Sequence, residues 1–222
     1  MDQKTKIAVI GGGGRTGNYL VSQLLNQGFF VKLLLRNPEK IQKSFSSDNP
    51  LIEIVKGDVL DFKVVKYLIE NCDAVISTVG QRKGEPLVAS RATTNILKAI
   101  TENMAPGLGK QRYILVAGLN VDTPFDKKGA DTLAATEWMK ANFPEIHKDR
   151  QKAYAILTKS DAEWTLVRVP FIEFTEARKP IQISLEDAAG TKIGAADIAG
   201  FLIDQIKDQN YIRKAPFISN IG

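Results

Sequence analysis

The sequence has one cysteine and one histidine, and no run of apolar residues approaches the roughly 20 that a membrane-spanning helix needs. Because Cys72 is alone, an internal disulfide is excluded, and we expect a reducing compartment such as the cytoplasm. Residues 1–4 lead directly into an apolar run, so we expect no signal peptide and no membrane partner. No zinc-ligand pattern is present, and therefore no metal site is expected.

The positive charge is scattered rather than clustered. The net charge is +5 and the isoelectric point is about 9.2, but no basic helix or RNA-binding signature accompanies them. We therefore expect no nucleic-acid partner, and attribute the charge to the surface and to a site for anionic ligands. With 222 residues, 44% of them apolar, the chain fits one α/β domain over residues 1–222.

Glycine is concentrated in residues 11–17, between two apolar runs. Residues 6–10 form a short β-branched run typical of a buried strand, and residues 29–35 form the next one. Residues 18–26 carry apolar side chains at helical spacing. This order predicts a βαβ unit of about 30 residues, the size of one dinucleotide-binding half.

The glycine spacing gives each residue a physical role. Gly11 allows a tight turn, Gly14 lets the backbone approach a pyrophosphate, and Gly17 permits close helix packing. With Gly12, the segment also matches the G-x-G-x-x-G motif of dinucleotide-binding proteins. The alternative to nucleotide binding is that the glycines only form a flexible turn. The predicted phosphate-binding residues are Gly11, Gly14, Arg15, Thr16 and Gly17.

Arg36 ends the second strand, where an NAD site usually places an acidic residue. Together with Arg15 and Lys40 it favours the 2′-phosphate of NADP(H) over NAD(H), by charge and by bidentate hydrogen bonds. The alternative is that Arg36 and Lys40 are ordinary solvated charges.

The strand ends that follow predict the rest of the crevice. Strands are expected at residues 51–55, 74–79, 111–117 and 164–169, an edge strand at 181–185 and a last strand at 215–219. Helices are expected at 85–103 and 146–160 and from residue 194, and residues 120–150 are expected to form a lid or small helical insertion. The cofactor-binding candidates at these strand ends are Asp58, Val59, Thr78, Val79, Gly80, Ala117, Gly118, Pro170 and Phe171. The alternative for Asp58 is that it only caps its loop and does not contact the cofactor.

Several motifs occur in the same order along nearly the whole chain: Gly11/Gly14/Gly17, and residues 34–37, 57–60, 73–76, 94–96 and 164–168. Together they resemble the atypical short-chain dehydrogenases of the NmrA-like and biliverdin reductase B/flavin reductase group. The resemblance implies a single Rossmann-like doubly wound parallel sheet of order 3-2-1-4-5-6, often with a seventh strand. It also implies NADP(H) at the glycine loop and Arg36, and reduction of a flat conjugated acceptor such as a flavin or quinone.

The sequence departs from the wider superfamily at the proton-transfer groups. In a Tyr-x-x-x-Lys dyad the lysine lowers the tyrosine pKa, but here Thr158 follows Tyr154 at that spacing and Lys159 is one position late. The serine of the biliverdin reductase B-like proteins aligns with Gly118. Tyr154 remains the candidate catalytic acid, with helix packing as its alternative. His147 is expected to be a surface residue, and Arg168 to pair with a carboxylate.

Three functions are compatible with these sequence features. The first is an NADP(H)-dependent reductase of flavins or quinones, because hydride transfer to such rings needs little proton assistance. The second is a non-catalytic NmrA-type regulator that binds NADP and a protein partner. A sugar-nucleotide epimerase or dehydratase ranks third, since the dyad and a larger substrate domain are missing.

Overall fold

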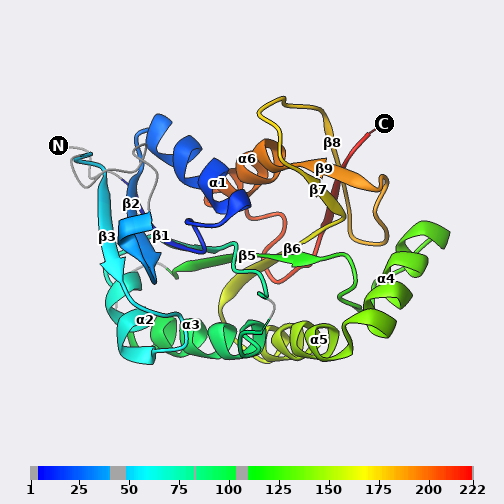
Figure 1. The fold of residues 1–222 in the computed structure, drawn as a ribbon, viewed down its shortest axis with the longest axis horizontal. Helices are drawn as coiled ribbons and strands as arrows, with labels where there is room; N and C mark the ends of the chain where they lie inside the picture. The colour runs from blue at the N-terminus through cyan, green and yellow to red at the C-terminus, as the bar shows by residue number, and fades with distance from the viewer. Residues whose placement is uncertain (1–4, 41–48, 83, 104–109, 222) are drawn as a thin grey trace.

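The apolar runs form one central sheet, and the amphipathic stretches between them form helices on both of its faces (Figure 1). The computed structural model describes residues 5–40, 49–82, 84–103 and 110–221. The strands are β1 (Lys6–Ile10), β2 (Phe30–Leu35), β3 (Ile52–Lys56), β4 (Ala74–Ser77), β5 (Arg112–Gly118), β6 (Glu163–Val169), β7 (Phe171–Glu173), β8 (Ile181–Ser184), β9 (Lys192–Gly194) and β10 (Phe217–Asn220). The helices are α1 (Arg15–Asn26), α2 (Phe62–Ile69), α3 (Ala89–Asn103), α4 (Ala130–Asn142), α5 (Pro144–Thr158), α6 (Ala195–Asp204) and the short 3-10 helix η1 (Pro38–Lys40).

The main sheet has the order β3-β2-β1-β4-β5-β6-β10-β8, and its neighbouring strands are parallel except for β10 and β8. This confirms the predicted doubly wound order 3-2-1-4-5-6 with a seventh strand, which is β10. The edge strand expected at residues 181–185 is β8. The strand order reverses between β1 and β4, and in such sheets ligands bind beyond the strand ends at that point.

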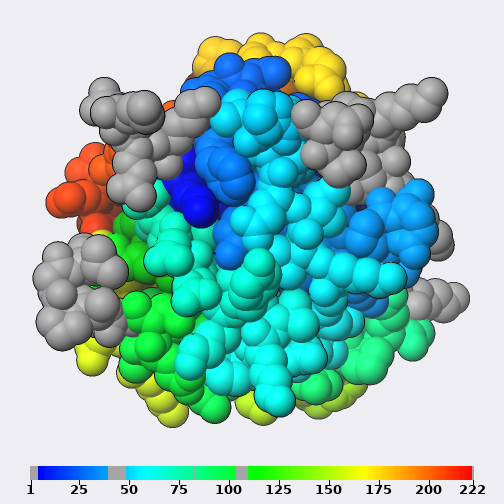
Figure 2. Space-filling model, turned by 90° about the vertical axis from the view of Figure 1, so that its left-hand side faces the viewer, coloured from blue at the N-terminus to red at the C-terminus, as the bar shows by residue number. Residues whose placement is uncertain are grey.

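Two helical layers enclose the sheet and create two apolar cores. α1 and α6 lie together on one face, and α2, α3 and α5 lie on the other (Figure 1). Leu20 and Leu33 are fully buried in the first core, and Leu68 and Ile96 in the second. Burying each such side chain stabilises the fold by about 1.5–3 kcal/mol. α2 and β3 form much of the surface at the β3 edge of the sheet (Figure 2).

The helix predicted for residues 85–103 begins later, at Ala89. The side chain of Gln81 accepts a hydrogen bond from the Val88 N–H at 3.3 Å and holds the preceding residues in a loop. The Asp149 carboxylate then accepts from the Ala89 N–H at 2.8 Å, and thus caps α3 from another helix. A cap 60 residues away along the chain leaves no local signal in the sequence.

Residues 120–150, expected to form a lid or small helical insertion, contain α4 and the start of α5 and are therefore mostly helical. α4 is an insertion that lies at the end of α5 (Figure 1). The side chain of Arg168 in β6 is fully buried and pairs with Asp126 at 2.7 Å, which confirms its predicted carboxylate partner.

Cys72 packs after α2, and burial raises the pKa of its thiol to about 12. The thiol therefore stays protonated, which agrees with a packing role. In the ranges that the structure describes, no helix is long and apolar enough to cross a lipid bilayer.

Candidate functional site

The turn after β1 brings backbone rather than side chains to the crevice. Gly11 has a φ of +85°, and a Cβ there would lie 2.8 Å from the Thr78 carbonyl carbon. A Cβ on Gly17 would collide with the Gly11 carbonyl oxygen, and one on Gly12 would collide with the Leu33 side chain. The predicted tight turn is therefore present, with Gly17 packed on the loop and Gly12 on β2.

The N-terminus of α1 is open at this turn. Its N-cap residue, Gly14, has no side chain to cap the helix, and the first turn has no acidic residue. The N–H groups of the first turn and the helix dipole therefore favour an anion. The absent Cβ atoms leave room for a pyrophosphate to approach the backbone closely, so the loop fits a dinucleotide coenzyme.

A cavity of about 770 Å3, called the first cavity, extends from this loop across the ends of β1, β2 and β4. Ten of the predicted cofactor-binding residues line it: Gly11, Gly14, Arg15, Thr16, Arg36, Asp58, Val59, Thr78, Val79 and Gly80. Gly17 does not line the cavity, because it supports the loop from beneath. The structure thus brings the predicted residues together, and their part in binding stays a prediction.

Arg36 lies at the mouth of the first cavity, as expected for a residue that reads the 2′ position. Its guanidinium donates two hydrogen bonds to the Glu85 carboxylate, at 2.9 and 3.0 Å. This pair raises the pKa of Arg36 and lowers the pKa of Glu85. Asp58 accepts from the Leu60 N–H at 2.8 Å, so it caps its loop and also lines the cavity. The side chain of Lys40 lies outside the described part of the structure.

Arg15 also lines the first cavity, where Phe174 holds its side chain. Its guanidinium stacks on the Phe174 ring at 3.8 Å from the ring centre. A cation–π contact leaves the edge of the guanidinium available for hydrogen bonds. Arg15 is therefore a second cation next to the predicted phosphate site.

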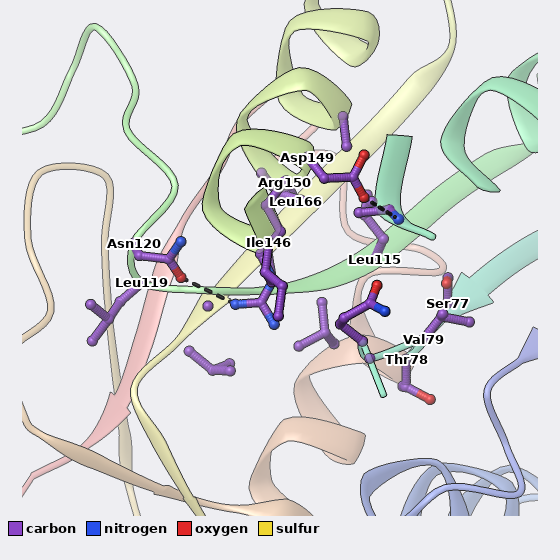
Figure 3. A pocket seen from close by; sticks show the side chains of 18 of the residues that line it. Ser77, Thr78, Val79, Leu115, Leu119, Asn120, Ile146, Asp149, Arg150 and Leu166 are labelled. Atoms are coloured by element: carbon purple, nitrogen blue, oxygen red, sulfur yellow. Dashed lines mark hydrogen bonds between the residues drawn. The ribbon is translucent and has the colours of Figure 1, made fainter. Parts of the chain in front are cut away.

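Figure 3 shows residues that line another cavity, which has a volume of about 490 Å3 and is called the second cavity. Both cavities are lined by Thr16, Thr78, Val79, Gly80, Gln81 and Val88, so they meet beyond β4. The other predicted residues, Ala117, Gly118, Pro170 and Phe171, line the second cavity. A ligand lying across the strand ends can thus contact both cavities.

A polar network that sequence reasoning missed lies at the edge of the second cavity, which Asn120 and Arg150 line. Arg150 in α5 donates to the Asn120 Oδ1 at 3.2 Å (Figure 3), and the Asn120 amide nitrogen lies 3.1 Å from the His147 Nδ1. His147 is therefore not the plain surface residue that was expected, and partial burial lowers its pKa. The positions of His147 and Arg150, three residues apart on one predicted helix, were the available signal.

Tyr154 is a different case, because it lines neither cavity. Its ring packs edge-on against Trp164, with ring centres 6.1 Å apart, and burial raises its pKa. This placement supports the helix-packing alternative and removes the geometric basis for Tyr154 as a catalytic acid. The fully buried Tyr113 does line the second cavity, but burial raises its pKa, so the hydroxyl stays protonated.

The fold and the crevice together define a dinucleotide-binding α/β protein. The model of the NAD(P)H-binding family matches residues 11–209, and the chain belongs to this family. An uncharacterised chloroplastic protein from Arabidopsis thaliana is 32% identical over 124 residues, which are 53% of this chain and 42% of that protein. Eugenol synthase 1 from Petunia hybrida is 35% identical over 127 residues, 55% of this chain and 38% of that protein. The matches thus span less than half the length of these curated relatives.

Solved structures show the same fold over almost the whole chain. ChuY, an anaerobilin reductase from Escherichia coli O157:H7, has a TM-score of 0.77 at 17% identity, covering 97% of both chains. A short-chain dehydrogenase/reductase from Veillonella parvula in complex with NADP has a TM-score of 0.76 at 14% identity, covering 99% of this chain and 95% of that one. This protein therefore shares the Rossmann-like α/β fold of these structures.

Proposed function

We propose that this protein is an NADPH-dependent reductase of a flat conjugated acceptor, of the flavin or quinone class. The observation that carries the proposal is the junction of the two cavities beyond β4, where six residues line both. One cavity has the glycine loop and cations that suit a dinucleotide, and the other can hold an acceptor beside it. Several relatives are reductases by name, including an isoflavone reductase homolog from Nicotiana tabacum.

The preference for NADPH rests on the charges of the first cavity. Arg36 presents a planar fork at the end of β2, and Arg15 adds a second cation beside the glycine loop. A 2′-phosphate can accept bidentate hydrogen bonds from Arg36 once the guanidinium is shared with or released by Glu85. When bound, NADPH supplies the hydride, and the chain supplies the cradle that orients it.

The walls of the second cavity suit a flat ring. Trp138 of α4 and Phe171 of β7 line it with exposed aromatic side chains, and Leu115 and Leu166 add aliphatic surface. Such walls can hold a conjugated ring by stacking. No tyrosine–lysine dyad reaches the cavity within the described ranges, so acceptors whose reduction can be completed by a solvent proton fit best.

The proposal is tested by NADPH oxidation under anaerobic conditions with FMN, riboflavin and menadione as acceptors. We expect NADPH consumption that depends on both the acceptor and the protein, and faster turnover with NADPH than with NADH. The matched control is Gly17→Ala, whose added Cβ would collide with the glycine loop and should abolish turnover.

The opposite outcome is equally informative. Tight NADPH binding with no turnover for any of the three acceptors would contradict the reductase proposal and favour the non-catalytic regulator. In that case a co-purifying protein partner would be the next measurement.

A further inference from the structure

Arg150 lies in the second cavity with most of its hydrogen-bonding capacity unused. Burial lowers its pKa, yet a guanidinium remains charged at neutral pH. Of its five N–H donors, one bonds within the described part of the chain, to the Asn120 Oδ1 at 3.2 Å. The neighbouring Asp149 carboxylate accepts hydrogen bonds from the Ala89 N–H and the Ser90 hydroxyl, and it acts on Arg150 only through its charge, which opposes part of the lowering of the Arg150 pKa.

The other two arginines withdrawn from solvent are satisfied very differently. Arg168 donates to Asp126 and to three backbone carbonyls, and it stacks on Phe217. Arg112 donates five hydrogen bonds, four to backbone carbonyls and one to Thr165. Both belong to the framework of the fold. A guanidinium with one partner, facing an apolar cavity, instead fits a group whose partner arrives with a ligand.

The position of Arg150 points to the bound acceptor. A Cβ on Gly118 would lie 2.9 Å from the Arg150 Nη1, so the guanidinium occupies the space beside the end of β5. Arg150 lines the second cavity and not the first, which places it apart from the predicted phosphate site. The Asn120 amide, itself bonded to His147, holds one edge of the guanidinium and leaves the other donors free for a ligand (Figure 3).

We propose that Arg150 binds a carboxylate on the acceptor, and that this protein therefore prefers flat aromatic acceptors that carry one. This inference rests on the proposed function of the second cavity. The aromatic and aliphatic walls hold the ring, while Arg150 pairs with the carboxylate through bidentate hydrogen bonds. A ring without the anion leaves a desolvated cation unpaired and binds more weakly.

The test compares an anthraquinone carboxylate with its uncharged carboxamide, by equilibrium quenching of tryptophan fluorescence, because Trp138 lines the cavity. We expect the wild-type protein to bind the carboxylate about tenfold to a hundredfold more tightly. Arg150→Met should abolish this preference, and Arg150→Lys should keep part of it. Arg91→Met removes an exposed arginine of α3 and should leave the preference unchanged.

Asn120→Asp provides a second variant in case Arg150→Met does not fold. It places a carboxylate beside Arg150 without changing the shape of the side chain, and should also remove most of the preference. Equal binding of the two probes by the wild type, or a preference that survives in Arg150→Met, would overturn the inference.

An NADPH titration separates this inference from the proposed function. Arg150→Met should bind NADPH within about twofold of the wild type, because the guanidinium lies outside the first cavity. Loss of NADPH binding together with the preference would assign Arg150 to the coenzyme and overturn the inference. A carboxylate preference without any NADPH turnover would instead contradict the reductase proposal and leave Arg150 as an anion site.

Discussion

The two cavities that meet beyond β4 are built in different ways. The glycine loop and Arg36 of the first cavity come from one contiguous segment, from β1 to the residue after β2, and the turns after β3 and β4 complete the cavity wall. The second cavity is assembled from residues of β4, β5, α3, α4, α5 and β7, which are far apart in the sequence. A cradle made of backbone leaves a glycine signature, whereas a pocket made of distant side chains leaves almost none.

The largest expected effect is the loss of coenzyme binding in Gly17→Ala, a change that alters the first cavity and not the second. Gly17→Ala places a Cβ against the Gly11 carbonyl oxygen, so the loop must shift and coenzyme binding should be lost. Such overpacking costs about 1–3 kcal/mol, which corresponds to a melting temperature lower by roughly 2–12 °C. Titration calorimetry checks the loss of coenzyme binding, and scanning calorimetry checks the lower melting temperature.

Gly80→Ala is the control for stability, because a Cβ there would meet no atom within 4 Å. Its melting temperature should match that of the wild type. A Gly17→Ala protein that still binds NADPH normally would show that the first cavity does not depend on the glycine cradle.

A smaller effect is expected where one helix caps another. Asp149→Ala removes the acceptor for the Ala89 and Ser90 N–H groups at the start of α3. Loss of such a cap costs about 0.5–2 kcal/mol, so thermal unfolding should begin roughly 1–8 °C lower. The dissociation constant for NADPH should change little, since Asp149 does not line the first cavity. An unchanged melting temperature would mean that this cap does not stabilise α3.

What the sequence can predict differs between the glycine loop, which one segment forms, and the second cavity, which distant residues form. The positions of Gly11, Gly17 and Arg36 around the glycine loop could be predicted, because the local order of strand, turn and helix fixes where their backbone lies. The position of Arg150 could not be predicted, because it depends on a hydrogen bond to Asn120, which is 30 residues away in the sequence. Tyr154 was misplaced because helical spacing shows that a residue is near a site but not which way it faces.

Glu85→Gln should have a modest effect confined to the first cavity. The Glu85 carboxylate occupies two donors of Arg36 and adds negative charge near the predicted 2′-phosphate site. Removing that charge should tighten NADPH binding about twofold to fivefold and leave NADH binding nearly unchanged. Glu102→Gln, which breaks a comparable exposed pair with Lys66, is the matched control. Weaker NADPH binding in Glu85→Gln would show that Glu85 positions Arg36 instead of competing for it.

The smallest expected effect is a pH dependence of stability at the second cavity. Burial lowers the pKa of His147 below its ordinary value of about 6.5, so the unfolded chain takes up this proton more readily. The stability from neutral His147 is full above that pH and is lost as the pH falls below it. Unfolding of His147→Gln should depend less steeply on pH between about 5 and 7 than unfolding of the wild type. Identical slopes would contradict a His147 side chain that partial burial keeps neutral.

Calorimetric titration of NADPH and NADH into the wild type and Arg36→Gln tests the central claim most directly. If the glycine cradle and Arg36 together hold a 2′-phosphorylated coenzyme, the wild type should bind NADPH at least about tenfold more tightly than NADH. Arg36→Gln should remove that difference by weakening NADPH binding alone. Equal affinity of the wild type for both coenzymes, or an equal loss of affinity for both in Arg36→Gln, would contradict the claim that Arg36 binds the 2′-phosphate.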